Sequence, residues 1–151
     1  MEAEVYPDPQ VATFITDNFV PARAHAKEQP EAFERFGAQW TPTILILDPN
    51  GTERHRFEGY LPAPDFLAQL RLGLAHAAKA RNDWADAERR YREVADDPSA
   101  GDVAPEALYW AGVSKYKGSG DPRALAETAE AFKSRFTESA WAKKASVWSG
   151  G

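Results

Sequence analysis

The sequence contains no cysteine among its 151 residues. Thiol nucleophiles, cysteine-bound zinc and iron–sulfur clusters are therefore excluded, and so is dithiol–disulfide chemistry by the chain's own residues. The lack of cysteine does not identify a compartment, because it is compatible with reducing and with oxidising surroundings.

Long apolar runs are missing as well. No stretch approaches the roughly 20 consecutive apolar residues that a membrane-spanning helix needs. The first residues include Glu2 and Glu4, where a secretion signal would be basic and then apolar. We therefore expect a soluble, cytoplasmic protein that does not use a membrane as a partner.

A net positive charge is also absent. The chain has 18 Lys and Arg against 23 Asp and Glu, a formal net charge of −5. Broad binding to nucleic acid needs a basic face, so no nucleic-acid partner is expected. The hydrophobic content of 43% and charged content of 27% are typical of a globular chain that buries a core without disulfides.

Motifs of familiar catalytic and cofactor sites are missing too. There is no Gly-x-Ser-x-Gly elbow, no Ser-x-x-Lys pair and no glycine-rich phosphate loop. The three histidines, His25, His55 and His76, lie on different predicted elements without metal-ligand spacing. We expect exposed, solvated imidazoles, and we predict no catalytic residue, no metal and no cofactor.

What is present divides into two regions of different periodicity, and the first alternates between helix and strand patterns. Residues 10–19 and 30–36 carry apolar side chains at helical spacing, whereas residues 20–26 alternate strictly. The apolar run at residues 43–47 predicts a strand buried on both faces. An Asp-Pro-Asn-Gly turn then leads to a hairpin partner at residues 53–58. This order predicts an α/β domain with about three strands.

The second region is helical throughout. Four stretches between residues 65 and 136 repeat apolar side chains at spacings of three and four, and Trp141 and Trp148 mark a last short helix. Loops rich in Asp, Gly and Pro separate these stretches. We interpret Trp84, Trp110 and Trp141 as packing anchors between antiparallel helices. The predicted division is an α/β domain over residues 1–75 and an α-helical region over residues 76–151.

Trp40-Thr41-Pro42-Thr43 stands directly before the apolar strand, and the turn and hairpin strand follow it. This arrangement resembles the second half of a thioredoxin-like domain, over about residues 1–70. The resemblance implies a cis bond before Pro42 and pairing of the Thr41 backbone with an extended peptide. Trp40, Thr41 and Pro42 are therefore the candidate peptide-binding residues. Packing of the Trp40 ring on the helix at residues 33–36 is the alternative for that side chain.

The sequence departs from this family at its redox motif. Relatives carry Cys-x-x-Cys at the start of a helix that follows the central strand. Residues 1–6 resemble the stretch just after that motif, which implies that motif and strand would lie before Met1. A start site placed too late and a natural short form are the two explanations. In both cases we expect no disulfide oxidoreductase activity from this chain as given.

The helical region resembles tetratricopeptide (TPR) hairpins. Ala87 and Tyr91 occupy the small and aromatic positions of a second helix, and Tyr109-Trp110-Ala111-Gly112 resembles the next first helix. About one and a half units are recognisable, fewer than the three that an independent solenoid needs. These helices are therefore expected to pack on the first domain or on another chain.

The resemblances together imply an incomplete thioredoxin-like sandwich followed by an all-α, TPR-like helical hairpin region. Two functions stay open: the remainder of a cytoplasmic thiol–disulfide oxidoreductase, or a non-catalytic peptide-binding, adaptor or chaperone-like module. Either function needs a protein or peptide partner. Without a central strand, the strands at residues 20–26 and 43–47 would pair directly or pair between chains in a homodimer.

Overall fold

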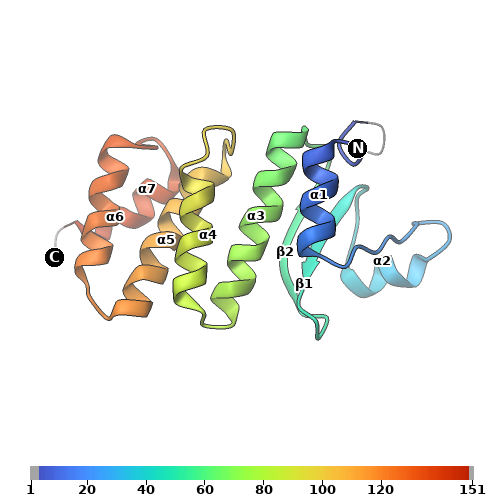
Figure 1. Cartoon of the computed structure of the whole chain (residues 1–151), viewed down its shortest axis with the longest axis horizontal. Coiled ribbons are helices and arrows are strands. Elements are labelled where there is room, and N and C mark those ends of the chain that lie inside the picture. Colours follow the sequence, from blue (N-terminus) through green and yellow to red (C-terminus); the bar gives the residue numbers. More distant parts are fainter. Residues whose placement is uncertain (1–3, 150–151) are drawn as a thin grey trace.

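A computed structural model describes residues 4–149 of the chain. Figure 1 shows an elongated arrangement, with a hairpin and its neighbouring helices at one end, a row of helices at the other, and the helix at residues 63–80 between them. The elements of this part are α1 (Pro9–Asn18), α2 (Pro30–Phe36), β1 (Thr43–Leu47), β2 (Glu53–Glu58), α3 (Ala63–Ala80), α4 (Trp84–Ala95), α5 (Val103–Ser119), α6 (Arg123–Ser134), α7 (Ala140–Ala145) and the 3-10 helix η1 (Ser146–Trp148).

The local sequence sets several helix ends. The Asp8 carboxylate accepts hydrogen bonds from the backbone N–H groups of Gln10 and Val11, at 2.9 and 3.2 Å, and so caps α1. α2 begins on Pro30, whose fixed φ suits a first helical turn, and ends at Gly37 with φ +63°. Within the described residues, no helix has the length and apolarity that crossing a membrane requires.

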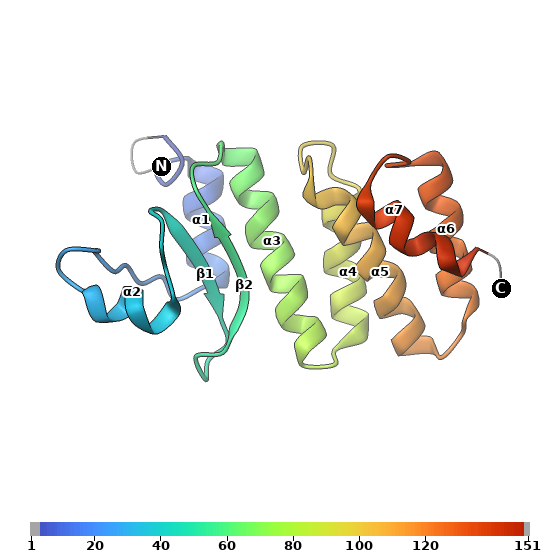
Figure 2. The same cartoon turned by 180° about the vertical axis from the view of Figure 1, so that it is seen from behind.

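The sheet is an antiparallel hairpin in which Ile44 lies opposite Phe57 and Ile46 opposite His55. These side chains share the face that packs on α3 (Figure 2), where the Phe57 and Phe66 ring centroids are 5.6 Å apart. The strand β1 is not buried on both faces as predicted. Ile46 is buried, but Leu47 is 39% exposed, because helices cover only one face completely.

Residues 20–26 form no strand, so the expectation of about three strands is wrong and the described sheet has two. Val20 is 98% exposed, and the whole segment 20–26 lies on the surface. Strict alternation favours a strand only where a neighbouring strand offers hydrogen bonds, and Pro21 has no N–H to donate. Direct pairing of this segment with β1 is absent from residues 4–149, where β1 pairs with β2 alone.

Two hydrophobic cores meet at α3. On one side, Phe66, Leu67 and Leu70 pack with the hairpin and with residues before and within α1. On the other side, Leu72 and its neighbours pack against α4 and α5. The members of this second core on α3 are Ala68, Leu72, Ala75 and Ala78. The predicted division after residue 75 therefore falls inside a helix that serves both cores.

The later helices pack in sequence, with α4 between α3 and α5 and α6 against α5 (Figure 1). Trp110 and Trp141 both pack against the second core, and their ring centroids are 6.2 Å apart. Tyr109 stacks on Trp148 at 4.8 Å. These aromatic contacts hold α7 and η1 onto α5.

Candidate functional site

The loop between α2 and β1 carries the three residues that the sequence nominates. The Thr41–Pro42 peptide bond is cis. The Thr43 hydroxyl donates to the Trp40 carbonyl at 2.6 Å, and the Gly59 N–H donates to the Pro42 carbonyl at 2.8 Å. The loop is therefore tied to both strands of the hairpin.

The backbone of Thr41 lies just before β1. The bond between Gly59 and Pro42 extends the antiparallel ladder, in which Thr43 lies opposite Glu58. Because successive residues of such a ladder point their backbone groups to alternate sides, those of Thr43 are directed to the free edge of β1, and Thr41 lies just before this edge. Within residues 4–149, neither the N–H nor the C=O of Thr41 has a hydrogen-bond partner. These groups can accept an added strand.

A surface pocket of about 300 Å³ adjoins this backbone. The Trp40 side chain is 64% exposed, so it forms a wall of the pocket and is not buried against α2. None of the lining side chains carries a charge. The lining residues are Ala26, Phe33, Ala38, Gln39, Trp40 and Thr41. An apolar side chain fits such a lining better than a charged one.

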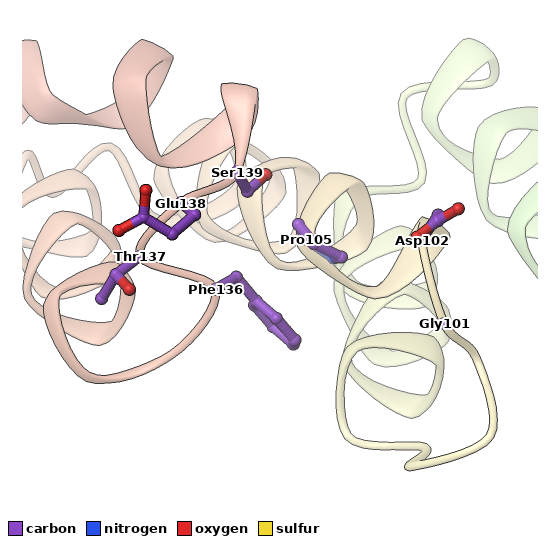
Figure 3. A pocket seen from close by; sticks show the side chains of 7 residues that line it. All are labelled: Gly101, Asp102, Pro105, Phe136, Thr137, Glu138 and Ser139. Carbon is purple, nitrogen blue, oxygen red and sulfur yellow. The ribbon is translucent and has the colours of Figure 1, made fainter.

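A second surface pocket, of about 490 Å³, lies at the far end of the molecule. Figure 3 shows the Phe136 ring directed into the space between the loop before α5 and the segment before α7. The Ser139 hydroxyl caps α7 by accepting from the Trp141 N–H at 3.0 Å. The lining residues are Gly101, Asp102, Pro105, Phe136, Thr137, Glu138 and Ser139. None of the nominated residues lies here.

Two of the three histidines are not the exposed imidazoles that we predicted. His25 is exposed, but His55 and His76 are half-buried and their ring centroids lie 5.3 Å apart. His76 bonds the Tyr91 hydroxyl through Nδ1 at 2.6 Å and a Glu106 oxygen through Nε2 at 3.2 Å. The prediction failed because these residues come from four elements, and no sequence spacing brings them together.

His55 bonds the Gln69 side-chain oxygen through Nε2 at 2.6 Å. Burial lowers the pKa of His55, and the nearby His76 lowers it further, while the bond to Gln69 acts in the opposite direction. Burial also raises the pKa of Tyr91 far above its ordinary value. No group of three or more His, Cys, Asp or Glu in the described part of the chain is arranged to hold a metal ion.

Comparison with known proteins gives one match, to the first half of the chain. Residues 1–73 match the family model of a thioredoxin-like domain. No curated protein and no solved structure matches the chain. The match confirms the thioredoxin-like character that was predicted for this region, and it ends within α3. The hairpin with its flanking helices is consistent with part of such a domain.

Proposed function

We propose that this chain is a redox-inactive thioredoxin-family protein that binds an extended peptide at Trp40, Thr41 and Pro42. The observation that carries the proposal is the unpartnered Thr41 backbone beside an uncharged pocket. Redox inactivity follows from the absence of cysteine in these 151 residues.

The proposed binding mode is strand addition. Main-chain groups of the peptide would pair with those of Thr41, and one apolar peptide side chain would enter the pocket between Trp40 and Phe33. An exposed tryptophan beside a backbone edge supports this mode, because aromatic side chains contribute a large share of the energy at peptide interfaces.

We further propose that α4, α5 and α6 are TPR-like hairpins that act as an adaptor or chaperone-like extension of the peptide site. Tyr91 on α4 and Phe132 on α6 are both buried at the centre of the helical core. Ala87 and Ala111, at the small positions of the pattern, are fully buried where helices approach closely. This placement of small and aromatic residues supports the assignment.

A second candidate is the remainder of a cytoplasmic thiol–disulfide oxidoreductase. The match of residues 1–73 to a thioredoxin-like domain favours it. Such a protein would need a Cys-x-x-Cys motif from elsewhere in its gene product. Reading the gene upstream of Met1 in frame tests this: a stop codon without that motif would exclude it.

Peptide-array binding tests the first candidate. Trp40→Ala and Pro42→Ala should each weaken binding about tenfold or more, the loss expected for a residue central to an interface. Val147→Ala is the matched control, since Val147 is exposed but lies in η1, far along the chain. Circular dichroism should show unchanged folding in all three. Binding profiles that do not change in the two loop variants would contradict the proposal.

A further inference from the structure

We propose that the contact between β2 and α3 is proton-sensitive, so that acidification loosens the hairpin from α3 while the later helices stay packed. A cluster that we call the histidine seam crosses this contact: His55 on β2, Gln69 and His76 on α3, Tyr91 on α4 and Glu106 on α5. This regulation does not depend on peptide binding.

Close packing brings the two imidazoles together. A Cβ added to Gly73 would overlap the Ile46 side chain and lie 3.4 Å from the His55 Cβ. At this glycine the backbone of α3 therefore packs directly against side chains of the sheet. Gln69, Gly73 and His76 follow at i, i+4 and i+7, which places them on one face of α3. His55 is thereby held between Gln69 and His76.

His76 has a hydrogen-bond partner at each ring nitrogen. In its neutral form, Nε2–H donates to Glu106 and Nδ1 accepts from the Tyr91 hydroxyl, the tautomer that satisfies both contacts. Both ring nitrogens of His76 are therefore paired.

His55 has a partner at only one ring nitrogen among the described residues. Its Nε2–H donates to the neutral Gln69 amide, and Ile46 lies opposite it on β1. Glu106 on α5 and Glu53 on its own strand attract a charge on His55, but neither is hydrogen-bonded to it within residues 4–149. A proton on His55 would create a half-buried cation whose ring centroid lies 5.3 Å from that of His76. Moving β2 away from α3 would relieve the desolvation cost of this cation.

The direction of the pH effect follows from burial. Because the pKa of His55 is lowered in the folded protein, the unfolded chain binds this proton more readily. The contact is therefore complete above the ordinary histidine pKa of about 6.5 and weakens as the pH falls below it. Lys79, one turn after His76 on α3, is directed to α5, where its Nζ lies 3.5 Å from the centre of the Trp110 ring.

Amide hydrogen exchange, corrected for the intrinsic effect of pH, tests the proposal. Between about pH 7 and about pH 5, protection of the β1 and β2 amides should fall relative to that of α6, because the opened hairpin binds the His55 proton more readily. His55→Gln should abolish this selective loss. His25→Gln, which removes an exposed imidazole, should leave it unchanged.

Two outcomes would overturn the proposal: equal loss of protection in hairpin and helices, or the same selective loss in His55→Gln as in the unmodified chain. An NMR titration of the imidazole protons in the unmodified protein does not depend on a variant that folds. It should give His55 a midpoint below the ordinary histidine value of about 6.5. A His55 midpoint at or above that value would also refute the proton-sensitive seam.

Discussion

Gly112 on α5 lies against Thr128 on α6 so closely that a Cβ on Gly112 would be 2.7 Å from the Thr128 Cβ and would overlap its hydroxyl. Thr128 is itself buried, and its hydroxyl donates to the Ala124 carbonyl at 2.7 Å. The missing side chain at residue 112 therefore sets the distance between the two helices.

Gly112→Ala should destabilise the protein by about 1–2 kcal/mol. Overpacking costs about 1–3 kcal/mol, and the better helix propensity of alanine returns up to about 1 kcal/mol. Urea unfolding followed by circular dichroism measures the change. Lys117→Ala, an exposed position on the same helix, should shift stability by less than about 0.5 kcal/mol. A Gly112→Ala protein as stable as the unmodified chain would contradict the close approach.

Ser114→Ala should stabilise the protein by about 1 kcal/mol. The Ser114 hydroxyl is fully buried and is the buried side-chain group without a hydrogen-bond partner in the part of the chain that the structure describes. Burying an unpaired hydroxyl costs about 1–3 kcal/mol, and Ser114→Ala removes this cost. The variant loses only the few contacts that the oxygen atom makes. Ser134→Ala is the control, because that hydroxyl is exposed. A loss of stability in Ser114→Ala would show that the hydroxyl has a partner.

Tyr91→Phe should destabilise the protein by about 1–2 kcal/mol near neutral pH, since His76 Nδ1 loses its donor inside the core. Tyr109→Phe, at a half-buried tyrosine whose ring contacts stay intact, should change stability much less.

The same tyrosine predicts an alkaline effect. Burial raises the pKa of Tyr91, so the unfolded chain releases its phenolic proton first. Stability should therefore fall as the pH rises above about 10, and Tyr91→Phe should flatten that fall. The midpoints of denaturant unfolding, measured for the unmodified chain and for Tyr91→Phe across this pH range, test the prediction. Parallel pH profiles of the two proteins would contradict a buried phenol.

Association through β1 remains a prediction. Its second edge has no strand partner within residues 4–149, and Leu47 at its end is exposed. We expect self-association that grows with concentration in analytical ultracentrifugation. Leu47→Lys places a charge at this edge and should shift the protein toward monomer. Sedimentation as a monomer at every concentration would remove this prediction.

Local patterns sufficed for the elements whose partners lie next to them in the chain. The hairpin at β1 and β2 followed from an apolar run and a turn whose Gly51 adopts φ +86°, and α3 to α6 followed from helical spacing. Residues 20–26 show the limit of this reasoning. Their alternation is typical of a strand, but a strand also needs a neighbouring strand to pair with. A local sequence pattern does not indicate whether such a partner strand is present.

The candidate site divides in the same way. Trp40, Thr41 and Pro42 are contiguous and could be identified from their motif, whereas Phe33 and Ala26 reach the same pocket from an earlier helix and loop. No sequence pattern predicts the histidine seam, because its members are brought together only when α3 packs between β2 and α4. Chemistry assembled by tertiary packing cannot be found from spacing.

The double role of α3 bears on how this chain can be divided. One face of the helix closes the core of the hairpin end, and the other closes the core of the helical end. A fragment that keeps α3 would expose one apolar stripe to water, and a fragment without it would lose a wall of its interior. Near neutral pH, where the contact between β2 and α3 is complete, the protein should consequently melt in one cooperative transition, and neither end can be transplanted into another protein without a substitute for this shared helix.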